Sequence, residues 1–385
     1  MKQVIILAIL CALSIPIPAQ ESITLSDAAD ISLMTVDPGA FVYSTFGHTA
    51  IRVKDPDQRF DRCYNFGTFD FDQPNFLLKF CRGKLLYNLD VEPYRNFEYG
   101  NLQDQRPMKE QLLRLDQPQK QRIFNLLQEN YKEENRYYKY DFFYDNCATR
   151  IRDVLEETFF HQLQYDTSAL TKDATMRQLL RPYLVDKPWT GFGIDLVLGL
   201  PADQKALATH HMFLPDYVHD LMGKARTKTG ELIIASERKI PSYSTFKDAF
   251  QPTPFDRPLW MMCLVMVLGL LSMANARADK IFDAIFWTIL GLAGLVIALL
   301  WFATDHSATK WNLNILWALP THLLYSVIKQ HTVWAKRYGM AVGGIALALL
   351  LGWVWLPQEL PTAAIPLVFL VVVKTLGKQI AGLQS

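Results

Sequence analysis

Apolar residues are concentrated at the two ends of this chain, and the region between them mixes apolar and polar positions. After Pro258, five apolar segments follow one another, at about 259–275, 281–303, 313–328, 338–356 and 362–376. Several reach or approach the roughly 20 residues that a helix needs to span a bilayer, although Pro320 and His322 interrupt the third. The pattern predicts an all-α membrane domain over residues 259–385 with about five transmembrane helices.

Residues 20–250 show the shorter periods of a soluble region that contains both strands and helices. Residues 41–53 and 62–71 are rich in aromatic and β-branched residues, which is typical of two paired strands. Apolar residues with helical spacing predict a helix over 117–131. A polar stretch with prolines at 251–258 predicts a linker to the membrane domain.

The N-terminus has a different character. One lysine precedes a short apolar run, which ends with Pro16, Pro18 and Ala19. This pattern is typical of a signal peptide over residues 1–19, and an uncleaved membrane anchor is the alternative. We expect cleavage after Ala19 and export of the region that follows.

Basic residues mark one set of loops in the membrane domain. Loops 276–280 and 329–337 carry lysine and arginine, whereas loops 304–312 and 357–361 are not enriched in them. Basic loops stay on the cytoplasmic side, so the soluble region falls on the opposite side, in agreement with the signal peptide. The sequence predicts a multi-pass protein of the cell inner membrane whose soluble domain lies in the periplasm.

Composition narrows the function classes. The chain has 385 residues, half of them hydrophobic, and a net charge of +1. This length favours more than one domain, and the charge gives no reason to expect nucleic acid as a partner. No HExxH pattern, P-loop or dinucleotide fingerprint is present, and the adjacent His210 and His211 make a poor chelate. We therefore expect neither a metal nor a cofactor.

Export also allows disulfides to form. Cys63, Cys81 and Cys147 lie in the exported region, so one thiol is left over after any single pairing. A Cys63–Cys81 bridge that leaves Cys147 free would fit this count.

The stretch YYKYDFFYDNCATRIRDVL at residues 137–155 carries the first candidate chemistry. Apolar residues recur with helical spacing after the cysteine, and Asn146 is a favourable N-cap, so Cys147 falls in the first helical turn. Unpaired N–H groups and the helix dipole can lower the pKa of a thiol there and make it a nucleophile. We assign Asn146 and Tyr144, which ends the aromatic run, to substrate binding. A buried structural cysteine is the alternative.

A histidine on a predicted strand supplies the second part. His48 lies next to Gly47 on the strand at 41–53. A thiolate–imidazole pair requires a base that reaches the sulfur and a third polar group that orients the ring. Asn65 on the adjacent strand is our first candidate for that group, and Asp70 is the second. A purely structural histidine is the alternative.

Polar residues follow the second membrane segment on its predicted outer side. Asp305 and His306 come directly after the segment, and Asn312 lies in the same loop. Ionisable groups at a membrane boundary are often only interfacial anchors. The functional interpretation is a docking site for a lipid headgroup, on the same side as Cys147 and His48.

The order of a strand histidine, a second strand and Asn-Cys at a helix start resembles the circularly permuted papain-like fold of the lecithin:retinol acyltransferases and related phospholipase/acyltransferases. The motifs FGHTAIRV, YNFGTFDF and YDFFYDNCATRIRD, with TDH and WNLN in the C-terminal bundle, resemble the Bacteroidota lipoprotein N-acyltransferase family, Lnb. This resemblance covers nearly the whole chain.

The resemblance implies an α+β permuted papain-like (NlpC-type) periplasmic domain, followed by an all-α multi-span membrane domain. It implies transfer of a fatty acyl group from a phospholipid, through a cysteine thioester, to the N-terminal amine of a diacylglyceryl lipoprotein. Cys147 maps to the nucleophile and His48 to the base, whereas the third member is left open.

Other function classes stay open on the sequence alone. A membrane-anchored NlpC-type cell-wall amidase or peptidase would use the same Cys147 and His48 on peptidoglycan, and a phospholipase is a near variant. A wall substrate would not need a multi-span bundle, which disfavours the peptidase. A non-catalytic membrane scaffold or transporter, in which both residues are structural, is not disfavoured by the bundle.

Overall fold

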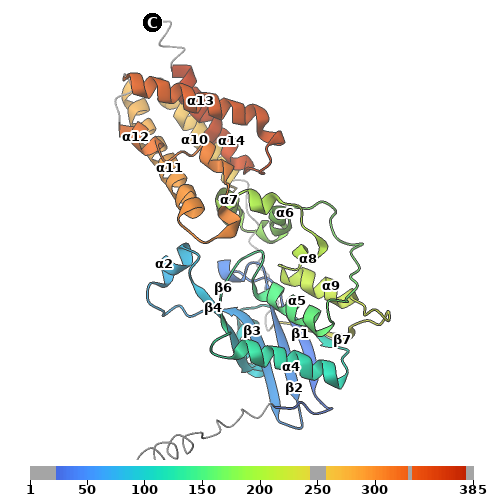
Figure 1. The fold of residues 1–385 in the computed structure, drawn as a ribbon. Coiled ribbons are helices and arrows are strands. Elements are labelled where there is room, and N and C mark those ends of the chain that lie inside the picture. The colour runs from blue at the N-terminus through green and yellow to red at the C-terminus, as the bar shows by residue number, and fades with distance from the viewer. Residues whose placement is uncertain (1–22, 243–256, 328–331, 379–385) are drawn as a thin grey trace, which may run out of the picture.

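The computed structural model describes residues 23–242, 257–327 and 332–378. A part that contains the sheet and a helical part lie end to end along the molecule (Figure 1). The predicted signal peptide at 1–19 lies outside the described residues, as does most of the predicted linker at 251–258.

A seven-stranded antiparallel sheet with the order β6-β4-β3-β2-β1-β5-β7 forms the centre of the soluble part. Its strands are β1 (Asp30–Val36), β2 (His48–Asp55), β3 (Phe60–Thr68), β4 (Leu86–Pro93), β5 (Met108–Leu113), β6 (Tyr137–Lys139) and β7 (Ile234–Ile240). The predicted pairing of β2 with β3 is confirmed. The predicted strand at 41–53 is too long, because Val42–Ser44 form a 3₁₀ turn and β2 begins only at His48.

Helices cover both faces of this sheet, and further helices lie between the sheet and the membrane part (Figure 1). They are α2 (Phe76–Cys81), α3 (Tyr94–Gln103), α4 (Gln117–Tyr131), α5 (Cys147–Thr158), α6 (Met176–Leu180), α7 (Pro188–Val197), α8 (Ala208–His211) and α9 (Pro215–Lys224). The predicted helix at 117–131 is confirmed as α4, which begins with Asp116 as N-cap. Figure 1 shows α4 and α5 over one face of the sheet, with α6 and α7 between the sheet and the membrane part.

Apolar side chains on the two faces of the sheet form separate cores. Phe124 of α4 and Ile151 of α5 belong to a buried cluster with Ile51 of β2. On the other face, Phe97 of α3 packs in a cluster with Cys63 of β3. Because side chains alternate across a strand, β2 and β3 fill both cores and are fixed in position beneath α5.

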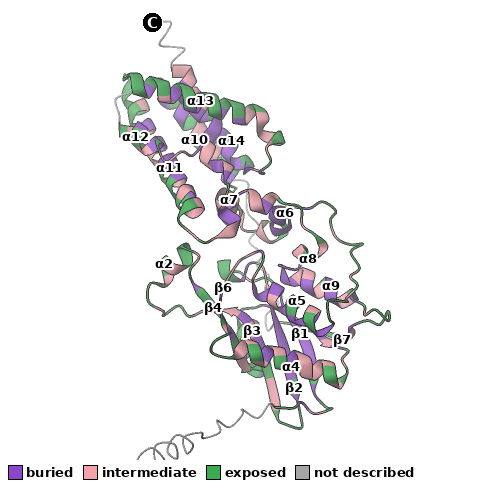
Figure 2. Cartoon of the chain, in the orientation of Figure 1, coloured by how far each residue is buried: buried purple, intermediate pink, exposed green. Residues whose placement is uncertain are grey.

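The membrane part contains α10 (Pro258–Ser272), α11 (Ala276–Phe302), α12 (His322–Val327), α13 (Val333–Gly352) and α14 (Ile365–Val372) within the described residues. Two helical segments there, 276–302 and 333–355, are long and apolar enough to cross a membrane. Figure 2 shows that α11 and α13 expose much of their surface. The exposed side chains of α11 include large aliphatic ones such as Ile285 and Leu299, which suits contact with lipid.

The predicted third membrane segment at 313–328 is not one continuous helix. Leu313–Leu316 form a 3₁₀ turn, and α12 begins only at His322. Pro320 lies between them and lacks the N–H that a helix interior requires. The helix in this segment, α12, is therefore too short to span a bilayer.

The predicted Cys63–Cys81 disulfide is not formed, and the described cysteines are all free. Cys63 is fully buried beneath α3, whereas Cys81 is exposed at the end of α2. The spacing of the two residues in the sequence gave no information on these different environments. The pairing that the thiol count left open is thus not present.

Candidate active site at the junction of the two domains

Asn146 fixes the start of α5. Its side-chain oxygen accepts hydrogen bonds from the N–H groups of Ala148 at 2.8 Å and Thr149 at 2.9 Å. Its amide nitrogen donates to the carbonyl oxygens of Phe142 and Phe213, both at 2.8 Å. All four hydrogen-bonding positions of this buried side chain are thus occupied within the protein. These bonds place Asn146 to position the neighbouring cysteine.

Cys147 follows as the first residue of α5, as predicted, and is 7% exposed. Burial raises the pKa of its thiol to about 11. The N–H groups of Thr49, Ala148 and Cys147 itself act in the opposite direction, as does the charge of Arg106. The expected lowering by the helix start is therefore present, but burial outweighs it, and the thiol is protonated at neutral pH.

His48 begins β2 and contacts the side-chain oxygen of Asn65 through Nε2. An amide oxygen only accepts hydrogen bonds, so Nε2 carries the proton and Nδ1 keeps its lone pair. Burial lowers the pKa of His48 to about 4, while the Asn65 contact raises it and the charge of Arg106 lowers it further. The imidazole is therefore neutral and able to accept a proton.

The residue next to His48 on β2 and a residue near Asn65 on β3 lie close to Cys147 at the start of α5. The N–H of Thr49, next to His48, reaches the sulfur of Cys147. Gly67, beside Asn65 on β3, has a φ of +84°, and a Cβ there would lie 3.4 Å from the Cβ of Cys147. A larger residue at this position would be strained and would press on Cys147. Asp70, the second candidate for the third group, lies in an exposed turn, where its carboxylate accepts from the N–H of Asp72 at 2.8 Å.

Arg106 is a member of this site that the sequence did not reveal. It is 7% exposed, and it donates from Nε to the carbonyl oxygen of Asp37 at 3.0 Å and from Nη1 to Asn101 at 3.2 Å. Its Nη2 has no partner within the described part of the chain. In the sequence it stands in the polar run DQRPMK, which is typical of an exposed turn, so no local signal indicated its burial.

Two tyrosines before Cys147 were recognised only as part of an aromatic run. The rings of Tyr140 and Tyr87 stack at 4.3 Å between centroids. The edge of Tyr140 and the hydroxyl of Tyr138 both lie close to Gly67. Burial raises the pKa of each phenol, and the charge of a Cys147 thiolate would raise it further. Both tyrosines therefore stay neutral beside the sulfur.

The loop after α11 holds the segment that leads to Cys147. Ser307 donates a hydrogen bond to the carboxylate of Asp141, and Asp141 and Asp145 exchange two backbone hydrogen bonds of 3.0 Å. The predicted docking residue Asp305 pairs with Lys139 at 3.2 Å. The lysine side chain lowers the pKa of that carboxyl group. The membrane part is thus bonded directly to the chain around the cysteine.

The other predicted docking residues also make contacts between the two parts. His306 lies with Nε2 3.1 Å from the carbonyl oxygen of Phe80 at α2. Asn312 is fully buried and donates to the carbonyl oxygen of Leu196 at 2.8 Å, while Gln358 donates to it at 3.1 Å. Tyr144 is 44% exposed, with its ring against His210. The described contacts of Asn312 are structural, and those of Tyr144 do not include Cys147.

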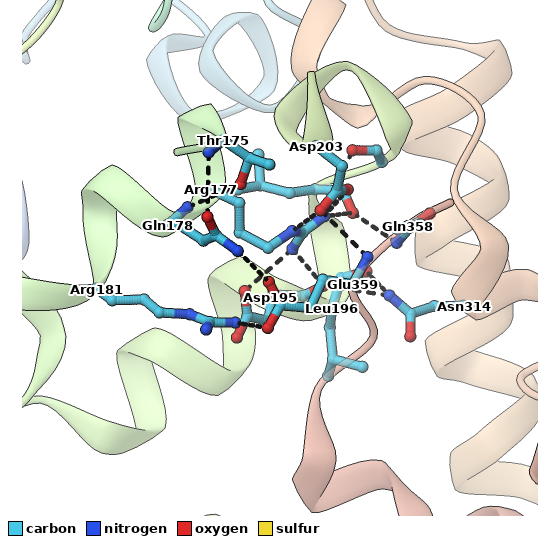
Figure 3. Close-up of polar contacts among 12 residues, drawn as sticks. Thr175, Arg177, Gln178, Arg181, Asp195, Leu196, Asp203, Asn314, Gln358 and Glu359 are labelled. Carbon is cyan, nitrogen blue, oxygen red and sulfur yellow. Dashed lines mark hydrogen bonds and ion pairs between the residues drawn. The ribbon is translucent and has the colours of Figure 1, made fainter. Parts of the chain in front are cut away.

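A second polar cluster joins the two parts around Arg177, which is 1% exposed (Figure 3). Its guanidinium donates to Asp203 through two bonds of 2.9 Å and to Asp195 at 3.0 Å. It also donates to the carbonyl oxygen of Leu198 at 3.1 Å. The N–H of Glu359 in the membrane part then donates to Asp203 at 3.1 Å. This cluster bonds the loop before α14 to the soluble part.

Together, the fold and the site define a membrane protein whose soluble α+β domain carries a neighbouring cysteine and histidine next to its membrane helices. The sequence pattern of the Lnb N-terminal periplasmic domain matches residues 19–182, and that of the Lnb transmembrane domain matches residues 245–383. The chain belongs to the Lnb family, as the resemblance implied. Its soluble part is therefore a periplasmic domain and its helical part a transmembrane domain. No curated protein and no solved structure matches the chain.

Proposed function

We propose that this protein is a lipoprotein N-acyltransferase of the inner membrane. It moves a fatty acyl group from a phospholipid to Cys147, and then to the N-terminal amine of an S-diacylglyceryl-cysteine lipoprotein. Membership of the Lnb family supports this reaction. The observation that carries it is the bond from Ser307, in the membrane domain, to Asp141 in the segment that leads to Cys147. This contact joins the segment before Cys147 to the membrane domain, which supports substrates that are held in the bilayer.

The proposal includes the domain boundaries expected from the sequence. Residues 1–19 are the signal peptide, 20–250 the periplasmic domain, 251–258 the linker and 259–385 the multi-span membrane domain. Loops 304–312 and 357–361 both contact the periplasmic domain, which supports their predicted place on the outer side. His48 on a strand that precedes the Cys147 helix supports a permuted papain-like arrangement.

The resting site holds a neutral thiol and a neutral imidazole. In the first half-reaction the thiol proton passes to Nδ1 of His48 as the sulfur attacks the ester carbonyl of the phospholipid. The N–H groups of Thr49 and Cys147, which reach the sulfur, are near enough to stabilise the oxyanion. The leaving alkoxide of the lysophospholipid takes the proton from His48, and the acyl group stays on Cys147 as a thioester.

In the second half-reaction the lipoprotein amine attacks the thioester. His48 accepts the proton that the nitrogen loses, the C–S bond breaks, and the proton returns to Cys147. Asn65 engages Nε2 of the ring, which leaves Nδ1 as the nitrogen that can accept and return the proton in both halves. The rings of Tyr87, Tyr140 and Phe142 around this segment are suited to limiting the access of water to the thioester.

Mass spectrometry of the purified protein tests the first half-reaction. After incubation with phospholipid and no amine, the peptide that contains Cys147 should carry a hydroxylamine-sensitive acyl group. Adding a diacylglyceryl lipopeptide should move that group to the peptide amine. Release as free fatty acid without transfer would favour the phospholipase, and the absence of any adduct would favour the scaffold.

A further inference from the structure

A cavity of about 270 Å³ lies at the junction of the two domains. Most of its wall is apolar and comes from five parts of the chain, around residues 46, 141, 180, 196 and 300–309. The wall includes Phe46, Tyr140, Phe142, Val197, Leu300 and Ala308. Since aromatic and aliphatic side chains dominate, this space suits a hydrocarbon better than a polar group.

Two residues of the cavity wall, Phe46 and Tyr140, lie close to the proposed reacting residues. The ring of Tyr140 approaches to 3.4 Å the point where a Cβ on Gly67 would be, and the Cβ of Cys147 lies 3.4 Å from the same point. Phe46 precedes His48 by two residues on the same short segment. The wall of the cavity therefore comes close to the nucleophile at Tyr140, while Cys147 and His48 themselves lie just outside its lining.

Another part of the cavity wall lies at the lipid-facing end of α11. Leu300 is in the last turn of this helix, and its neighbours Leu299 and Phe302 are 50% and 74% exposed. Both are large apolar side chains on a helix long enough to cross the bilayer. A chain that leaves the outer leaflet at this turn would enter the cavity without crossing water.

We infer that this cavity holds the acyl chain of the donor while it is attached to Cys147, and that its depth sets the length of the chain transferred. The inference rests on the proposed function. The volume is close to the roughly 300 Å³ at the small end of ligand pockets, which suits one acyl chain and not a whole phospholipid. The polar residues Asp141 and Ser307 on the wall suit the ester end.

The residues of α7 on this wall lie outside both family-matched segments, which end at residue 182 and resume at 245. Val197 ends α7 and is only partly buried, so a larger side chain there can enter the cavity without disturbing a packed core. Each methylene that loses its burial weakens binding about fourfold. A side chain that takes up the space of two or more methylenes in the cavity should therefore favour an acyl chain that is shorter by that number.

The test is a competition between phospholipids with short, medium and long saturated chains, read as the mass distribution of the acyl group on Cys147. Val197→Phe and Ala308→Leu narrow the cavity and should shift the distribution about tenfold toward shorter chains. Leu300→Ala widens it and should shift the distribution toward longer chains. Opposite shifts in the two directions cannot come from a general loss of folding.

Ile285→Phe is the matched control, because it adds bulk on the exposed face of α11, about four turns from the cavity, and should leave the distribution unchanged. If the unmodified protein acylates Cys147 but all three cavity variants keep its distribution, the cavity proposal is overturned while the proposed function stands. If the unmodified protein forms no adduct, the proposed function fails, and this inference fails with it.

Discussion

Two buried polar clusters in this molecule differ in how completely they are paired. Around Arg177, the guanidinium meets two carboxylates and several carbonyl oxygens, and one of those carboxylates also accepts from Glu359. Around Cys147, the side-chain oxygens of Thr49 and Tyr138 and the Nη2 of Arg106 have no partner in the part of the chain that the structure describes.

Buried polar atoms are nearly always paired in folded proteins, and leaving one unpaired costs free energy. The paired cluster lies where the two domains meet and is suited to holding them together. The cluster with open positions lies around Cys147, the proposed nucleophile, and is suited to binding groups that arrive with a substrate. Residue type alone does not distinguish the two clusters, since both contain arginine. The number of unpaired polar atoms does distinguish them.

The largest expected effect is the loss of transfer in Cys147→Ser. A hydroxyl is far less acidic than a thiol, so we expect activity to fall by at least about 10³-fold. The melting temperature in detergent should stay unchanged, since the two side chains are similar in size. Acylation of a lipopeptide amine measures the effect. Cys63→Ser is the matched control in the same domain and should retain transfer.

The second effect is on stability. Arg177→Met removes one partner of a buried ion pair and leaves Asp203 and Asp195 without the guanidinium that neutralises their charge, which should cost about 3–5 kcal/mol. Thermal unfolding in detergent should show this loss. Protein that stays folded at low temperature should still acylate Cys147. If Arg177→Met unfolds at the normal temperature, the contrast between the two clusters does not hold.

The parts of this structure that follow local rules could be predicted from the sequence. Asn146 and Asp116 are N-caps because their side chains bond to the next few N–H groups, and such contacts depend only on nearby residues. The pairing of β2 with β3 made His48 and Asn65 neighbours. The burial of Arg106 and the pairing of Asn312 could not be predicted, because both depend on segments distant in the sequence.

The same distinction explains the errors. Desolvation of Cys147 comes from packing of α5 on β2 and β3, so a rule for helix starts predicted the opposite direction for its pKa. The Cys63–Cys81 bridge came from a count of thiols, which contains no information on which face of a strand each residue occupies. Residues 313–328 are apolar enough for a membrane segment. Because Pro320 lacks the N–H that a helix interior requires, they do not form one continuous helix.

A third prediction concerns Arg106, whose Nη2 has no hydrogen-bond partner among the described residues. Its charge lowers the pKa of Cys147 and of His48, so Arg106→Gln should raise both pKa values. We expect transfer to fall roughly 10- to 100-fold, less than the loss of a donor that contacts the oxyanion directly. The acidic limb of the pH profile should move to higher pH, because His48 then protonates more easily. Arg106→Lys, which keeps the charge, should restore part of the activity and the original limb.

The fourth prediction is a broad pH profile for the unmodified protein. The productive pair is a thiol with a neutral imidazole, which is the main form between the pKa of His48, about 4, and that of Cys147, about 11. The kcat/KM for phospholipid should change less than about twofold between roughly pH 5 and 9, since it reports the free enzyme. It should fall as the pH drops through about 4. A limb near pH 6.5 would show that the ring is not buried as described.

The smallest expected effect concerns how lipid reaches the cluster around Cys147. Leu77 and Leu78 on α2 are 70% and 58% exposed, and the carbonyl oxygen of Phe80 on the same helix contacts His306 in the membrane domain. Lys79 and Arg82 lie on the same short segment, so its charge suits anionic headgroups while its leucines suit the outer leaflet.

Leu78→Ser should therefore raise the KM for phospholipid in vesicles about threefold to tenfold, from the loss of one partly buried aliphatic side chain. The kcat and the KM for the lipopeptide amine in detergent should not change, because α2 has no buried residues whose loss would disturb the fold. Tyr99→Ser removes a similarly exposed ring from α3, on the opposite side of the sheet from α5, and should leave both values unchanged. An equal rise in KM for the two variants would mean that α2 has no special relation to the bilayer. An effect confined to Leu78→Ser and to vesicles would show that the cluster around Cys147 receives its lipid substrate from the membrane.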